Sequence, residues 1–377
     1  MSAQTACWTI TLRCATASLA LVALAACGNG AAASPPPAPA AGTPPIELAL
    51  PLADLPQPPW LDLEGAKGIF PALTKETGRM LYDPLAMIVL RPDKKYTFDF
   101  PEAAGGKITF VTNNLGFRED APTEVQKSGR RILVLGDSQT EGVVDNKDSF
   151  ANVLEARLSQ RGPPVEVING GIGTTGPHNY LGVLLKHLDL RPDVVVVTIY
   201  DGNDFAHALQ IEDTLRGRKP EPVPPAAREA SKTRWPEQLP QSFNQAAIFQ
   251  ADPPAVDRAL AATLTACREL ARQADAIHAR VIFVALPAKP DIDHDDDELQ
   301  ATMLSTLGIT REDVAVNTQL GARLLAALAA DGRETLDLLP ILKQAQGPLY
   351  WRKDYHLNVT GHAAVAAALL DVVGTGN

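Results

Sequence analysis

The feature that most constrains the fold is a series of short, continuously apolar runs that alternate with segments of helical periodicity. The clearest runs are Ile132–Leu135, Val165–Ile168, Asp193–Tyr200 and Val281–Leu286, and residues 335–338 are also extended in character. Helical patterns cover residues 149–158, 178–188, 255–275, 310–330 and 359–373. Strands without polar alternation are buried on both faces, as in a parallel sheet covered by helices. The pattern therefore predicts an α/β domain over residues 126–377.

Two segments fall outside this alternation. Residues 60–125 contain the strand-like runs Met87–Leu90, Tyr96–Phe100 and Lys107–Val111, which predict a small β-rich accessory unit of two to four strands. Residues 206–252 are rich in proline and interrupt the alternation, so we interpret them as an insertion beside the sheet.

The N-terminus indicates export from the cytoplasm. Residues 14–26 are apolar but too short to span a bilayer, as in the h-region of a secretory signal. They end in Leu24-Ala-Ala-Cys27-Gly28, which resembles the lipobox of bacterial lipoproteins. The resemblance implies that residues 1–26 are a signal peptide and that Cys27 carries a diacylglycerol. With Gly28 next, it also implies outer-membrane sorting in a Gram-negative cell. The alternative is an ordinary secretory signal cut elsewhere.

The segment after the lipobox, residues 27–59, is rich in alanine and proline and reads as a semi-extended tether. The cysteine inventory then simplifies, since Cys7 and Cys14 leave with the signal and Cys27 is acylated. Cys267 alone remains, and its helical pattern predicts a small buried core residue. We expect no disulfide and no metal site. The formal net charge of −10 argues against nucleic acid as a partner.

Polar residues follow the predicted strands where open α/β sheets place their sites. Gly136-Asp-Ser138 follows the first strand, and Ser138 is either a reactive residue or the N-cap of a helix. The second strand leads into the glycine-rich segment 169–176, which can aim backbone N–H groups at a ligand or form a flexible turn. Asn203 follows the third strand, where its amide can point into the same site or cap a turn.

Near the C-terminus, Asp354-Tyr-His356 precedes the last helical pattern. A carboxylate two residues from a histidine can orient the ring and stabilise its protonated form. The alternative is a surface aspartate beside a histidine at the helix entry, with Asn358 as the N-cap.

Taken together, these motifs resemble the SGNH hydrolases, also called the GDSL esterase/lipase family, over roughly residues 113–377. Three further segments fit a bacterial subgroup of that family: Asn113–Arg118, Leu286–Lys289 and Asn358–His362. The resemblance implies a flavodoxin-like three-layer α/β/α fold.

It also implies the roles of the site residues. Ser138 would be the nucleophile of a two-step acyl transfer, His356 its general base and Asp354 the residue that orients His356. The oxyanion hole would comprise the backbone N–H groups of Ser138 and Thr174 and the side chain of Asn203. No metal or organic cofactor is implied.

The sequence departs from the family pattern in three places. The glycine usually found five residues after Asn169 is Thr174 here, with Gly173 as the alternative donor. In the third motif the glycine has moved next to Asn203, and His356 follows Asp354 by two positions where three is commoner in the family.

The expected function is that of a lipid-anchored esterase of the bacterial cell envelope. Its substrate would be an ester, in particular a small acyl group on an envelope or extracellular carbohydrate. One alternative is an O-acyltransferase that uses the same three residues and passes the acyl group to a sugar hydroxyl. Another is a non-catalytic envelope lipoprotein.

Overall fold

The computed structural model describes residues 60–75, 78–218, 240–293 and 297–374. The expected signal peptide, Cys27 and the tether lie outside the described residues, as do residues 219–239 of the expected insertion. Within the described ranges, no helix has the length and apolar character needed to cross a membrane.

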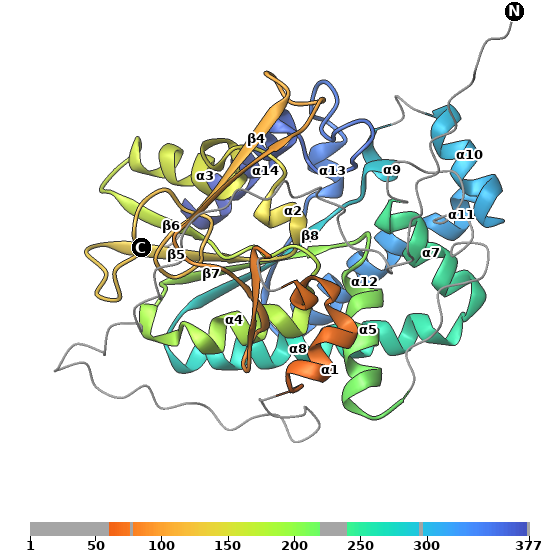
Figure 1. Cartoon of the computed structure of the whole chain (residues 1–377), viewed down its shortest axis with the longest axis horizontal. Coiled ribbons are helices and arrows are strands. Elements are labelled where there is room, and N and C mark those ends of the chain that lie inside the picture. The colour runs from red at the N-terminus through yellow and green to blue at the C-terminus, as the bar shows by residue number, and fades with distance from the viewer. Residues whose placement is uncertain (1–59, 76–77, 219–239, 294–296, 375–377) are drawn as a thin grey trace, which may run out of the picture.

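A parallel sheet forms the centre of the molecule, as Figure 1 shows. It has five strands. Its spatial order is β6-β5-β7-β8-β9, so the chain starts inside the sheet, goes to one edge and then crosses to the other. The strands are β5 (Arg130–Leu135), β6 (Val165–Asn169), β7 (Val194–Tyr200), β8 (Arg280–Leu286) and β9 (Glu334–Asp337). All five expected extended segments are confirmed.

Helices cover both faces of the sheet. One layer comprises α4 (Pro177–Lys186), α5 (Asp204–Leu215), α8 (Pro254–Ala276) and α12 (Val316–Ala330), and the other α3 (Phe150–Ser159), α13 (Leu339–Leu342) and α14 (Val359–Gly374). Alternate strand residues serve opposite layers: Leu133 and Leu135 enter the first core, and Ile132 and Val134 the second. The predicted three-layer α/β/α fold with its flavodoxin-like strand order is therefore confirmed.

The expected β-rich unit is present as two antiparallel hairpins. The first pairs β1 (Met80–Asp83) with β2 (Met87–Leu90), and the second pairs β3 (Lys94–Asp99) with β4 (Lys107–Thr112). The sequence indicated three of these strands but not β1, nor the preceding helix α1 (Leu63–Ile69).

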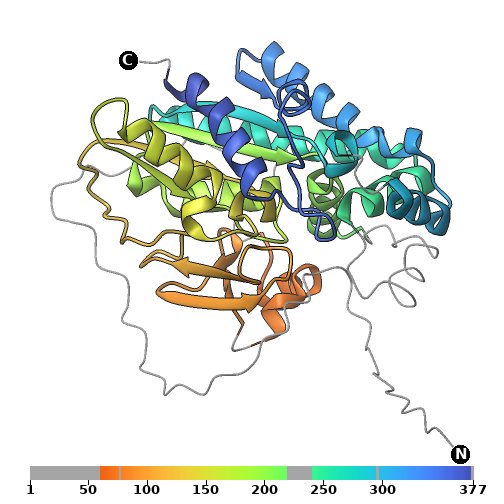
Figure 2. The same ribbon diagram turned by 90° about the horizontal axis from the view of Figure 1, so that it is seen from above.

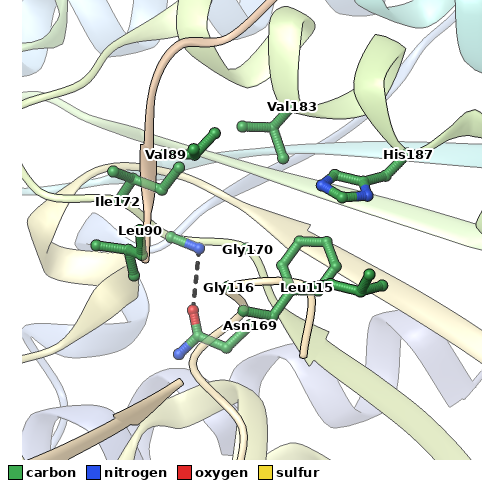
Figure 3. A pocket seen from close by; sticks show the side chains of 11 residues that line it. Val89, Leu90, Leu115, Gly116, Asn169, Gly170, Ile172, Val183 and His187 are labelled. Carbon is green, nitrogen blue, oxygen red and sulfur yellow. Dashed lines mark hydrogen bonds between the residues drawn. The ribbon is translucent and has the colours of Figure 1, made fainter. Parts of the chain in front are cut away.

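This N-terminal unit packs against the α/β layers (Figure 2) and shares their core. Trp60, Phe70 and Met87 belong to the same apolar cluster as the helices of the first layer. Where β2 meets the loop after β6 and helix α4, the remaining cavity is about 10 Å³ (Figure 3). That is on the order of the space one water needs, so this contact is a packed interface.

The interruption of the βα alternation is shorter than the expected 206–252. Helix α5 follows β7 directly and packs against α8, and α7 (Gln241–Ala251) ends close to the start of α8.

Cys267 lies in α8 and is buried, as predicted. Burial raises the pKa of its thiol above the usual range.

The remaining helices are short or peripheral. They are α2 (Ser138–Glu141), α9 (Lys289–Ile292), α10 (Asp297–Leu307) and α11 (Arg311–Val314), with single 3-10 turns at Pro71–Thr74, Asn146–Asp148 and Leu188–Leu190.

Candidate active site

Ser138 lies at the carboxyl end of β5, in the first turn of α2. Asp137 is the N-cap of this helix, because its carboxylate accepts the N–H of Gln139 at 2.9 Å. The interpretation of Ser138 as the cap is therefore wrong. Since Asp137 performs the capping, the Ser138 hydroxyl is available for another partner.

That partner is His356, on the loop before α14. His356 Nε2 lies 2.8 Å from Ser138 Oγ, and His356 Nδ1 lies 2.6 Å from Asp354 Oδ1. Ser138 and His356 are both buried, and the Asp354 side chain is 24% exposed. The structure thus joins the three side chains in one line of hydrogen bonds, although 218 residues separate the serine from the histidine.

The charges around His356 favour its protonated form. Burial alone would lower the pKa of His356, but the charge and hydrogen bond of Asp354 outweigh it, and the charges of Asp137 and Glu141 act in the same direction. The net effect raises the pKa above its ordinary value. Burial also raises the pKa of the Asp137 carboxyl, to about 6. A base whose protonated form is stabilised can draw a proton from a serine hydroxyl.

The two-residue spacing between Asp354 and His356 depends on the backbone of Tyr355. Tyr355 has φ +69°, in the left-handed region that non-glycine residues adopt infrequently. Its ring is buried, with the Lys289 ammonium 5.1 Å from the ring centroid and the Phe243 ring 6.3 Å away edge-on. Tight packing thus stabilises an uncommon backbone conformation between the two polar residues.

Gln139, the residue after Ser138, connects the nucleophile helix to the histidine loop. Its Nε2 donates to the Tyr355 carbonyl at 3.2 Å, and its Oε1 accepts the N–H of Leu357 at 2.9 Å. One amide therefore holds the backbone on both sides of His356. Gln139 was not predicted, since no local pattern distinguishes it from any other polar helix residue.

The glycine-rich loop after β6 lies against α2. A Cβ on Gly171 would come within 2.2 Å of the Glu141 nitrogen, so only glycine fits there. The N–H of Gly173 donates to Glu141 Oε2 at 2.7 Å. Thr174 has φ +64°, so a β-branched residue adopts the left-handed conformation at the position where the family pattern has glycine.

Asn203 follows the carboxyl end of β7, and β7 is the neighbour of β5 in the sheet. Its Nδ2 donates to Gln241 Oε1 at 3.0 Å, and its buried Oδ1 has no hydrogen-bond partner within the described ranges. Among the described residues, no hydrogen bond joins Asn203 to Ser138 or His356.

Three further charged residues lie at the site and were not predicted as site residues. Glu141, one turn after Ser138, forms a salt bridge with Arg79 of the N-terminal unit through both carboxylate oxygens. Arg118 is fully buried and donates to the carbonyls of Glu141, Gly142 and Val144. It is the last residue of the motif 113–118, so a signal for it was present, whereas none pointed to Arg79.

The described part of the chain contains no group of three His, Cys, Asp or Glu side chains arranged to hold a metal ion. The acidic run His294–Glu298, whose sequence could indicate either a cation site or a helix start, falls largely outside the described residues; α10 begins at Asp297. Asn358 is the N-cap of α14, as expected, and accepts the N–H of Gly361 at 2.9 Å.

Comparison with known proteins assigns the α/β domain to a family. The model of the GDSL-like lipase/acylhydrolase family matches residues 134–364, more than half of the chain. The matched region includes Ser138, the loop after β6, Asn203, Asp354 and His356. No curated protein matches the chain.

Several solved structures are similar to the chain. The acetyl xylan esterase AlAXEase is 17% identical, with 64% of this chain and 99% of that chain covered and a TM-score of 0.39. A GDSL-like lipase from Bacteroides thetaiotaomicron is 14% identical, with coverage of 65% and 88% and a TM-score of 0.36. The lipase Lip_vut3 from a goat rumen metagenome is 15% identical, with coverage of 66% and 99% and a TM-score of 0.41. Because these identities and TM-scores are low, the assignment of the family rests on the family model.

Proposed function

Because the chain belongs to the GDSL-like lipase/acylhydrolase family and is a serine ester hydrolase, we propose that Ser138, His356 and Asp354 are its catalytic residues. The observation that carries this proposal is the continuous line of hydrogen bonds from Ser138 Oγ through the His356 ring to Asp354.

In the first step, His356 Nε2 takes the proton of Ser138 as Oγ attacks the ester carbonyl. Asp354 accepts the Nδ1–H of the ring, which fixes the tautomer and stabilises the imidazolium that forms. The imidazolium then gives its proton to the leaving alcohol, and an acyl-enzyme remains. Water, activated by the same histidine, releases the acid.

The tetrahedral intermediate needs hydrogen-bond donors for its oxyanion, and one such donor is typically worth about 2.7–4 kcal/mol. We propose the N–H groups of Ser138 and Thr174 together with Asn203. The choice of Thr174 over Gly173 is supported by the contact of the Gly173 N–H with Glu141, which occupies that donor. Asn203 would turn one Nδ2 hydrogen towards the substrate while the other binds Gln241.

We propose as substrate an ester of a small acyl group with an envelope or extracellular carbohydrate. The envelope location expected from the segment Leu24–Gly28 motivates this choice of substrate.

The test of this function is covalent capture of the nucleophile. The purified full chain should hydrolyse p-nitrophenyl acetate and take up one fluorophosphonate probe, which peptide mass spectrometry should locate on Ser138. Acetylated oligosaccharide should then yield free acetate. Probe on another residue would reject the assignment of Ser138, and acetylated acceptor in place of acetate would identify a transferase.

For the location of the enzyme, we propose attachment to the bacterial envelope through a lipid on Cys27, in the outer membrane if the cell is Gram-negative. Cells fed an alkyne-tagged fatty acid should label the wild-type chain, and Cys27→Ala should abolish the label. Cys267→Ala is the matched control, because it removes the buried thiol of α8 and should leave the label unchanged. Label that persists in Cys27→Ala would refute the anchor.

A further inference from the structure

We propose that Arg79, which the N-terminal unit carries just before β1, is a positioning residue of the active site that acts through Glu141 on the oxyanion loop. The inference rests on the proposed function and assigns a catalytic purpose to the N-terminal unit.

The Glu141 carboxylate links three separate segments of the chain. It belongs to α2 and its side chain is only 3% exposed. Its two oxygens accept hydrogen bonds from both terminal nitrogens of Arg79, with Nη2 at 3.2 Å from Oε2. Oε2 also accepts the N–H of Gly173 at 2.7 Å. The N-terminal unit, the nucleophile helix and the loop after β6 are thus joined at one group.

This junction lies directly beside the nucleophile. A Cβ built on Gly173 would stand 3.6 Å from the Cβ of Ser138 and 3.2 Å from Arg79 Nη2. Thr174, the proposed oxyanion donor, is the next residue along. Any movement of Gly173 away from Glu141 therefore moves the Thr174 N–H relative to Ser138.

The carboxylate needs its cation to hold this arrangement. A buried carboxylate without a partner either takes up a proton or turns towards water, and both changes weaken its charge-assisted bond to an N–H. Arg79 is itself held in place, because its guanidinium lies 5.4 Å from the centre of the Phe110 ring on β4. Arg118 lies 3.8 Å from the same ring and donates to the Glu141 carbonyl, so it fixes the backbone and leaves the carboxylate to Arg79.

The N-terminal unit also contacts the other half of the site. Glu102, in the turn between β3 and β4, accepts the N–H of Arg352 at 2.7 Å and that of Lys353 at 3.2 Å, directly before Asp354. The Phe100 ring packs edge-on against Trp351 with centroids 5.3 Å apart. The unit therefore braces both the serine helix and the histidine loop, which agrees with a role in positioning.

The test measures kcat and KM of the full chain with p-nitrophenyl acetate. Arg79→Met is expected to lower kcat about 10- to 100-fold, a fraction of what the loss of a whole oxyanion donor causes, and to leave KM within about threefold. Arg79→Lys keeps the charge but not the two-pronged geometry, and is expected to fall between wild type and Arg79→Met. Lys107→Met is the matched control, because it removes another cation of the same unit from an exposed pair with Asp99.

A double-mutant cycle tests the route through Glu141. If Arg79 acts on that carboxylate, Arg79→Met in the Glu141→Gln background should cost no more than about twofold. The proposal would be overturned if the falls in kcat of the two single variants multiply in the double variant, or if the kcat of Arg79→Met stays within threefold of wild type. In either case, turnover by the wild type would still support the proposed function. If Arg79→Met does not fold, as judged by its circular dichroism and melting temperature, an Arg79→Lys variant as active as wild type would overturn it equally. Absence of turnover in the wild type would instead contradict the proposed function itself.

Discussion

Replacing Ser138 by alanine is expected to lower kcat for p-nitrophenyl acetate by about 10⁴-fold or more, to a small residual rate. His356 would then have no hydroxyl to deprotonate at 2.8 Å, and no acyl-enzyme could form. The residual rate would come from the oxyanion donors and substrate binding, which remain when a nucleophile is lost.

The fold should tolerate this substitution. Asp137 caps α2 through the N–H of Gln139, so the Ser138 hydroxyl is not needed for the helix, and alanine favours helical positions. We expect a loss of about 1 kcal/mol of unfolding free energy, because the buried His356 Nε2 loses its hydrogen-bond partner. A loss of activity far larger than this small loss of stability would separate chemistry from stability.

Ser242→Ala is the matched control for Ser138→Ala. Ser242 is also a buried helical serine, and its hydroxyl has no hydrogen-bond partner in the part of the chain that the structure describes. Its alanine variant should keep full turnover. Should Ser138→Ala retain more than a tenth of wild-type kcat, Ser138 would not be the nucleophile.

The sheet could be predicted because its strands carry a strong local signal. All seven residues of Val194–Tyr200 are buried. A strand covered on both faces is a continuous apolar run, which is easily recognised in the sequence. Strand β1 has no such signal: it is four residues long, two of them half-buried, and it forms by pairing with β2 over α4. A short strand stabilised by its neighbours leaves little trace in its own residues.

The residues of the proposed active site also divide into those with a local sequence signal and those without one. Ser138 and the pair Asp354 and His356 were predictable because each lies in a short motif at the end of a strand or the start of a helix. The contact between Arg79 and Glu141 joins residues 62 positions apart, and nothing in either local sequence distinguishes an ion pair from two solvated charges. Such contacts are products of the tertiary fold.

The backbone conformations of Thr174 and Tyr355 could not be predicted from the sequence either. Glycine is the usual sign of a positive φ, yet Thr174 and Tyr355 adopt it at the site without being glycine. The surrounding packing imposes these conformations, and a costly backbone that packing maintains is a frequent property of active sites.

A pair of substitutions at Tyr355 should reveal how much catalysis depends on that backbone. Both Tyr355→Val and Tyr355→Asn remove the ring between Lys289 and Phe243, but asparagine tolerates a positive φ and a β-branched valine does not. We expect kcat to fall about 10-fold for asparagine and about 10²- to 10³-fold for valine. The upper limit is the loss of about 10⁴ seen when a carboxylate no longer orients its histidine.

The pH profile of kcat/KM distinguishes loss of alignment from general loosening. Asp354 raises the pKa of His356, and catalysis needs the unprotonated ring, so wild-type activity should rise with pH through an inflection above 6.5. If valine turns Asp354 away from the ring, that contribution disappears, the pKa of His356 falls and the inflection moves to lower pH. The asparagine variant should keep the wild-type inflection. Equal losses and equal inflections in the two variants would mean that the Tyr355 ring, and not its left-handed backbone, aligns Asp354 with His356.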